Sequence, residues 1–203
     1  MPCYSYAGYR PVIHPEAFVH PMATLIGDAL VGPRCYVGPG ASMRGDFGRV
    51  ELCAGANLQD NCVMHSYPGR IARVGENGHV GHGAVLHGCE VGRGALIGIG
   101  AVIMDNVLIG EEALVAAMSF VKEGTQVPPR TLVGGIPARV MRELSAVELE
   151  WKADGVRQYQ ELARRSLLEL HPCEPLTAPE AGRQPRSGGS RPLAELRESG
   201  RGS

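Results

Sequence analysis

The chain has 203 residues, enough for one domain with a substantial core, and 44% of them are hydrophobic. Its formal net charge of −1 gives no electrostatic reason to expect binding to nucleic acid or to an anionic membrane. No apolar run approaches the roughly 20 residues that a transmembrane helix requires. Six cysteines without a C-x-x-C pair, in a chain without a secretory signal at its N-terminus, predict free thiols in a reducing cytoplasm rather than disulfides.

The first regular feature along the chain is a six-residue repeat of branched or long apolar residues. It occurs at 31–43 and 74–80 and runs without a break from Val91 to Val121. Glycine often follows the apolar residue, and a small residue often stands four positions after it. A period of six is even, so it fits strands rather than helices, and the glycines fit sharp corners between them. The repeat predicts an all-β fold, a parallel β-helix whose stacked coils enclose a continuous core.

This repeat resembles the hexapeptide-repeat family of left-handed parallel β-helices. The resemblance implies three hexads, or about 18 residues, in each triangular coil, and usually a trimer.

The C-terminal part of the chain has a different pattern. Ser145 and Glu148 have the spacing of a helix capping box, and the apolar residues that follow them have helical spacing. Beyond these, Pro, Gly, Ser, Arg and Glu dominate the sequence. We therefore expect a left-handed β-helix domain over 1–142, an α-helix within 143–172 packed alongside it, and a disordered tail over 173–203.

Three histidines flank a polar stretch in the middle of the repeats, His65 before it and His82 and His87 after it. His65 and His87 are 22 residues apart, which equals one coil of about 18 residues plus about four residues of loop. We expect the two to stack at one corner, about 4.8 Å apart, where both imidazoles can bind one metal ion. His82 lies almost one face earlier, so it is expected to serve an ion held by a neighbouring chain. Three histidines and a water are typical of a catalytic zinc site, and the alternative is three histidines that are each satisfied locally.

Longer motifs carry a more specific resemblance. The segments "RGDFG" (44–48), "NLQDNCVMH" (57–65) and "GHVGHGAVLHGC" (78–89) resemble the γ-class carbonic anhydrase family. The similarity is greatest to the branch of the phenylacetic acid degradation protein PaaY and the carnitine operon protein CaiE, and it covers about residues 1–175. It implies a homotrimer in which His65, His82 and His87 bind zinc at sites shared between subunits. Iron and cobalt are alternatives, because imidazole suits all three metals.

The same resemblance implies roles for five further residues. Gln59 would hydrogen-bond the metal-bound water, and Arg44 and Asp46 would pair across the subunit interface beside the site, with Asp60 nearby. A structural salt bridge in the trimer is an equally good interpretation of Arg44 and Asp46. Tyr159 matches a helix tyrosine of this branch, which either reaches the site or packs against the β-helix.

For the reaction, the resemblance implies a metal-dependent hydrolase, since zinc lowers the pKa of bound water to about 7. We expect a thioesterase in which metal-bound hydroxide attacks CoA thioesters of phenylacetate degradation. Reversible hydration of CO2, as in a carbonic anhydrase, is the closest alternative. Family members that transfer protons efficiently during CO2 hydration carry acidic residues around the site. In this sequence Phe47 follows "RGD" instead, and the loop after His65 carries Arg70 and Arg73.

Other functions stay open. Arg70 and Arg73 are either contacts for CoA phosphates or solvated loop charges. A hexapeptide-repeat acyltransferase and a non-catalytic trimeric accessory protein are further alternatives. The acyltransferase does not account for three histidines at these spacings, and bound zinc without hydrolysis would favour the accessory protein. The substrate is expected to be a small molecule, with no nucleic acid and no membrane as partners.

Overall fold

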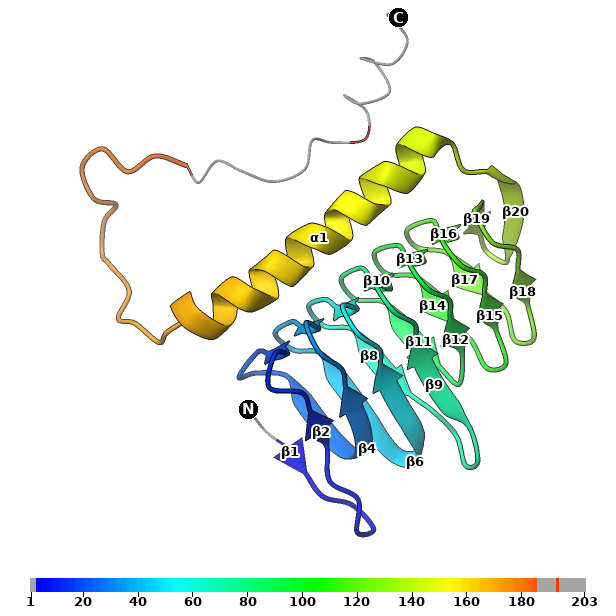
Figure 1. The fold of residues 1–203 in the computed structure, drawn as a ribbon, viewed down its shortest axis with the longest axis horizontal. Coiled ribbons are helices and arrows are strands. Elements are labelled where there is room, and N and C mark those ends of the chain that lie inside the picture. Colours follow the sequence, from blue (N-terminus) through cyan, green and yellow to red (C-terminus); the bar gives the residue numbers. More distant parts are fainter. Residues whose placement is uncertain (1–2, 186–192, 194–203) are drawn as a thin grey trace, which may run out of the picture.

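The computed structural model describes residues 3–185 and 193. The strands form a left-handed parallel β-solenoid of about seven coils, and α1 (Ala146–Glu169) lies along its outside (Figure 1). The predicted left-handed β-helix with a C-terminal helix alongside is confirmed. Most of the predicted tail, residues 186–192 and 194–203, lies outside the described residues.

Each regular coil contributes one short strand to each of three faces. Face 1 contains β1 (Cys3–Tyr4), the first part of β4 (Thr24–Val31), the first part of β6 (Ser42–Leu52), β8 (Val63–His65), β11 (Val85–His87), β14 (Val102–Ile103) and β17 (Phe120–Val121). Face 2 contains β2 (Val12–Ile13), the second parts of β4 and β6, β9 (Ile71–Val74), β12 (Glu90–Val91), β15 (Leu108–Ile109) and β18 (Gln126–Val127). Face 3 contains β3 (Phe18–Val19), β5 (Tyr36–Val37), β7 (Asn57–Leu58), β10 (His79–Val80), β13 (Leu96–Ile97), β16 (Leu114–Val115), β19 (Thr131–Gly135) and β20 (Ala138–Glu143). Neighbouring strands are parallel, except that β20 runs antiparallel to β19.

The hexad repeat decides which side chains form the core. The repeating apolar residues, such as Ile97 and Ile103, point inward and are fully buried. Adjacent coils place the same hexad position side by side, as where Leu86 pairs with Met64 on one side and Ile103 on the other. The result is one continuous apolar column, whose burial stabilises the stack.

Two predictions from composition bear on this architecture. All six cysteines are free thiols, and four of them are buried. Among the described residues, no helix is both long enough and apolar enough to span a bilayer.

The coil that follows β8 is enlarged by the loop 66–70. Despite this loop, His65 pairs with His87 on face 1, and Val74 pairs with Val91 on face 2. The extra residues that the 22-residue spacing predicted are therefore held at a corner and leave the strand register unchanged.

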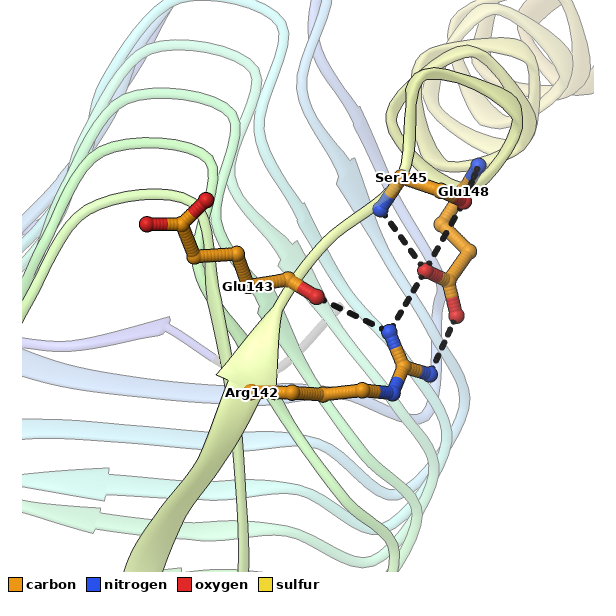
Figure 2. A network of polar contacts seen from close by, with 4 residues as sticks. All are labelled: Arg142, Glu143, Ser145 and Glu148. Atoms are coloured by element: carbon orange, nitrogen blue, oxygen red, sulfur yellow. Dashed lines mark hydrogen bonds and ion pairs between the residues drawn. The ribbon is translucent and has the colours of Figure 1, made fainter.

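A polar network fixes where α1 begins and which way it runs. Ser145 Oγ accepts a hydrogen bond from the Glu148 amide over 3.3 Å, and the Glu148 carboxylate accepts one from the Ser145 amide over 2.9 Å, as the capping box predicted. Arg142 of β20 donates two more hydrogen bonds to the same carboxylate, over 2.7 and 2.8 Å (Figure 2). The Glu148 side chain is almost fully buried there. The helix consequently turns back along face 3, where it contacts β3, β5 and β7.

Candidate functional site

The first polar cluster lies at the corner between faces 1 and 2. It consists of Arg44, Asp46, His65, His87 and Asp105, and we call it the His65 cluster. His65 and His87 end paired strands on adjacent coils, so their predicted stacking is confirmed. His65 Nδ1 lies 3.0 Å from His87 Nε2. The two imidazoles are therefore close enough to share one ion.

A carboxylate contacts the outer nitrogen of each of these imidazoles. Asp46 Oδ1 lies 2.9 Å from His65 Nε2, and Asp105 Oδ1 lies 2.5 Å from His87 Nδ1. A carboxylate accepts a hydrogen bond from an N–H, so the proton of each neutral ring belongs on the outer nitrogen. The inner nitrogens then face each other with their lone pairs, which repel unless a proton or a metal ion is shared between them. This donor set fits a metal that binds imidazole, because carboxylates behind the ligands are the usual support of such sites.

Local charge and burial keep His65 in its metal-binding form. Burial lowers the pKa of His65, and the hydrogen bond to Asp46 opposes this only in part. Burial also disfavours ionisation of Asp46, but hydrogen bonds from Arg44 and His65 outweigh it and lower the pKa of this carboxyl. His65 is thus neutral and Asp46 charged at pH 7.

Arg44 and Asp46 pair with each other within one chain. Arg44 Nη1 donates to Asp46 Oδ2 over 2.6 Å. The pairing across a subunit interface that the resemblance implied involves a second chain and stays a prediction.

The second polar cluster lies at the corner between faces 3 and 1. It consists of Asn57, Gln59, Asp60, His79 and His82, and we call it the His82 cluster. The Asp60 carboxylate contacts His82 Nδ1, and 46% of the His82 side chain is exposed. Gln59 is buried and donates from Nε2 to Asn57 Oδ1 over 3.1 Å. The second Gln59 contact, to His79 Nε2, is 2.8 Å long.

The strands of face 1 lie between the two clusters. His82 precedes β11, whereas His87 ends it beside His65, so His82 lies at the other end of the face 1 strands from the histidine pair of its own chain. Within residues 3–185, no group of three or more His, Cys, Asp or Glu side chains is arranged to hold a metal ion.

Tyr159 of α1 packs behind the His82 cluster. The centroid of its ring is 5.2 Å from that of His79 and 5.3 Å from that of Tyr36. Burial, followed by the nearby Tyr36 hydroxyl, raises the pKa of Tyr159 to about 12, so the phenol stays neutral. Of the two roles considered for Tyr159, the single chain displays packing.

Sequence reasoning did not identify His79, Tyr67 or Asp105 as residues of the site. Asp105 stands 18 residues after His87, one coil later, so the coil period was the signal that could have found it. Tyr67 lies in the loop 66–70, and its ring stacks on His87 with a centroid distance of 6.4 Å. Gly88 permits this approach, because a Cβ there would lie only 2.7 Å from the Tyr67 ring.

Phe47 completes the surroundings of the two imidazoles. Its ring centroid is 5.6 Å from that of His65, and 59% of the residue is exposed. Phe47 and Tyr67 thus flank the histidine pair with aromatic surface.

Comparison with known proteins places this geometry in a family, although no family model matches the chain. The chain is 55% identical over 183 residues to the carnitine operon protein CaiE of Salmonella agona, covering 90% of this chain and 92% of that protein. Against CaiE of Escherichia coli K12 the identity is 53% over 183 residues, with 90% and 93% covered.

Solved structures agree with this relationship. A Bacillus cereus protein described as an acetyltransferase matches with a TM-score of 0.78 and 34% identity, over 80% of this chain and 95% of that one. A hexapeptide transferase family protein from Anaplasma phagocytophilum matches with a TM-score of 0.78 and 30% identity, over 81% and 97%. The chain therefore belongs to the hexapeptide-repeat family, close to the carnitine operon protein CaiE.

Proposed function

We propose that this protein is a zinc-dependent hydrolase of CoA thioesters whose active sites are shared between the subunits of a homotrimer. The observation that carries the proposal is the His65–His87 pair, with a carboxylate behind each ring and the inner nitrogens 3.0 Å apart. His82 of a neighbouring subunit would add the third imidazole of a typical catalytic zinc site. Zinc, when bound, supplies a Lewis acid and lowers the pKa of bound water to about 7.

Face 1 supports the shared arrangement. Its outward-facing row is mostly apolar, and Val63 in this row is 39% exposed. The apolar residues of the row pair across successive coils: Val63, Val85, Val102 and Phe120. By contrast, α1 lies against face 3, and the outward row of face 2 contains the charged residues Glu51, Arg73 and Glu90. An uncovered apolar face fits contact with another protein surface.

The two clusters border opposite edges of this face. The His82 cluster precedes the face 1 strands along each coil, and the His65 cluster lies where those strands end. A second copy of the chain against face 1 would therefore bring the His65 cluster of one subunit towards the His82 cluster of the next. Three such contacts close a ring with three equivalent sites.

The surroundings of the His65 cluster favour an acyl substrate over CO2. Phe47 and Tyr67 offer aromatic surface on both sides of the histidine pair, which suits an apolar or aromatic acyl group. Carbon dioxide needs no such surface. Within this site, Gln59 would hydrogen-bond the attacking water, and the acyl group would lie against Phe47 and Tyr67.

Recognition of CoA phosphates would fall to Arg70. Arg73 is engaged elsewhere, since its Nε donates to Cys53 Sγ over 3.1 Å and lies 3.8 Å from Glu51 Oε2. Arg70 lies exposed in the loop 66–70, beside Tyr67. A guanidinium in that position is able to pair with a phosphate.

Metal analysis paired with turnover tests the proposal. Wild type, His65→Ala and His82→Ala are compared, with His171→Ala as the control because His171 is exposed and far along the chain from both clusters. We expect about one zinc per subunit and hydrolysis of phenylacetyl-CoA in the wild type and in the control, and loss of both in the other variants. Faster CO2 hydration than thioester hydrolysis would instead identify a carbonic anhydrase. A metal-free wild type that transfers acyl groups would refute the proposal.

A further inference from the structure

We infer that His79 is a positioning residue, which accepts a hydrogen bond from Gln59 and thereby fixes which end of the Gln59 amide faces the reacting water. The catalytic consequence rests on the proposed function, whereas the hydrogen-bond arrangement does not. Nothing in the longer motifs distinguished His79, which acts through Gln59 and has no contact with the His65 cluster of its own chain.

The Gln59 amide has both of its hydrogens engaged. One points to Asn57 Oδ1 over 3.1 Å, and the other to His79 Nε2 over 2.8 Å. Gln59 and Asn57 are 2% and 0% exposed, so these bonds are not exchanged freely with water. With Nε2 saturated, Gln59 Oε1 is the atom left to accept a hydrogen bond from the reacting water.

A third contact, between Asn57 and His79, bears on the tautomer of His79. Asn57 Nδ2 lies 3.2 Å from His79 Nδ1, which makes a closed ring of three contacts. A neutral imidazole accepts at one nitrogen and carries its proton on the other. The 2.8 Å contact from Gln59 uses His79 Nε2 as the acceptor, so the proton of the ring belongs on Nδ1. The contact between Asn57 Nδ2 and His79 Nδ1 then joins two donors, and at 3.2 Å it is the longest of the three.

A neutral His79 leaves one of the three contacts unmatched in either amide orientation, so only a charged ring would favour the reversed one. If both amides were reversed, Gln59 Oε1 and Asn57 Oδ1 would face the two ring nitrogens, and only an imidazolium could donate to both. Burial disfavours that charge and lowers the pKa of His79 to about 4, with further lowering from His82 and Lys152. At neutral pH no charge on the ring therefore favours reversal of the amides, and Gln59 keeps the orientation that the structure shows, with Oε1 outward.

Helix α1 holds His79 in this arrangement. The Tyr159 ring meets the His79 ring edge to face, at 5.2 Å and 86°. Gly155 lies against the same imidazole, because a Cβ there would be 3.6 Å from His79 Cε1. The helix thus acts on the site through Tyr159, His79 and Gln59 in turn.

The tautomer of His79 is the direct test, and it needs neither metal nor substrate. In metal-free protein with 15N-labelled histidine, we expect the His79 nitrogen shifts of an Nδ1–H tautomer. In Gln59→Glu the carboxylate accepts from Nε2, so the same ring should change to the Nε2–H form. An Nε2–H tautomer or an imidazolium in the wild type at pH 7 would overturn the assignment.

Kinetics test the consequence for the reaction. His79→Leu should keep its zinc and its KM but lose about ten- to a hundredfold in kcat, the range found for residues that orient groups of a metal site. His79→Gln, whose Oε1 can accept from Gln59, should recover part of that loss, and His171→Leu, at an exposed position outside both clusters, should behave as wild type. An unchanged kcat in His79→Leu would refute the positioning role. A wild type that hydrolyses nothing would remove the proposed function, and the tautomer would still decide the hydrogen-bond arrangement.

Discussion

A mixture of two inactive variants tests whether each site is built from two subunits. His65→Ala damages the His65 cluster and leaves the His82 cluster intact, whereas His82→Ala does the reverse. The two clusters lie at opposite ends of the face 1 strands, and every subunit of one variant lacks the same cluster, so neither variant can assemble a complete site from identical subunits. In a mixed trimer, a site is complete where a His82→Ala subunit supplies its His65 cluster to the intact His82 cluster of a His65→Ala subunit.

The expected recovery follows from the geometry alone. In a random one-to-one mixture, each side of an interface has the required subunit half of the time, so about one quarter of the sites are complete. Metal content and thioester turnover should therefore both return to about one quarter of the wild-type values after the variants are unfolded together and refolded.

A second mixture is the matched control. His65→Ala and His87→Ala damage the same cluster, so mixing them should restore nothing. Recovery in neither mixture would refute sharing between subunits. Recovery in both would show that the histidines do not act as two separate groups.

Three further predictions concern the groups behind the site. Asp105→Asn should weaken zinc binding by about ten- to a hundredfold in competition with a chelator, because it replaces the charged acceptor for His87 Nδ1 with a neutral amide, while Glu111→Gln at an exposed ion pair should not. His79 has a pKa of about 4 in the folded protein against an ordinary value of 6.5, so it should contribute about 3 kcal/mol of stability above pH 6.5 that is lost as the pH falls through 4. Urea unfolding of wild type and His79→Leu at both ends of this pH range should show a larger loss of stability in the wild type. Equal losses of stability in the two proteins would contradict the prediction. Arg142→Met should weaken the docking of α1, because Glu148 loses two charged hydrogen bonds, and faster hydrogen exchange confined to α1 is the expected signature.

The sequence predicted the architecture because the repeat reports side-chain direction. One inward apolar residue in every six specifies a short strand and a corner, and this alone leads to a stacked parallel coil. The stacking of His65 on His87 also needed the coil of about 18 residues that the resemblance to the hexapeptide-repeat family implied, since only a corner loop can absorb the remaining four or so residues without changing the register. Placing His82 apart from this pair needed no further information.

The remaining contacts depended on features that the repeat does not encode. Outward-facing polar residues such as His79 and Asp105 look alike in a hexad, and their partners depend on rotamers across neighbouring coils. The packing of α1 on face 3 follows from where β20 ends and from the Arg142–Glu148 bonds. The antiparallel turn into β20 is itself a local reversal, invisible in a six-residue period.

That reversal has a consequence for how copies of the chain can associate. An exposed coil of a parallel stack offers unpaired backbone groups that could template another chain and grow into a filament. On face 3, β20 presents an edge of the opposite direction, with Arg139, Arg142 and Glu143 exposed along it. A chain arriving in the parallel sense finds no matching ladder at this edge, although Val140 and Met141 are also exposed there. Growth from this edge is thereby disfavoured, whereas the sideways association proposed above would close into a ring of finite size.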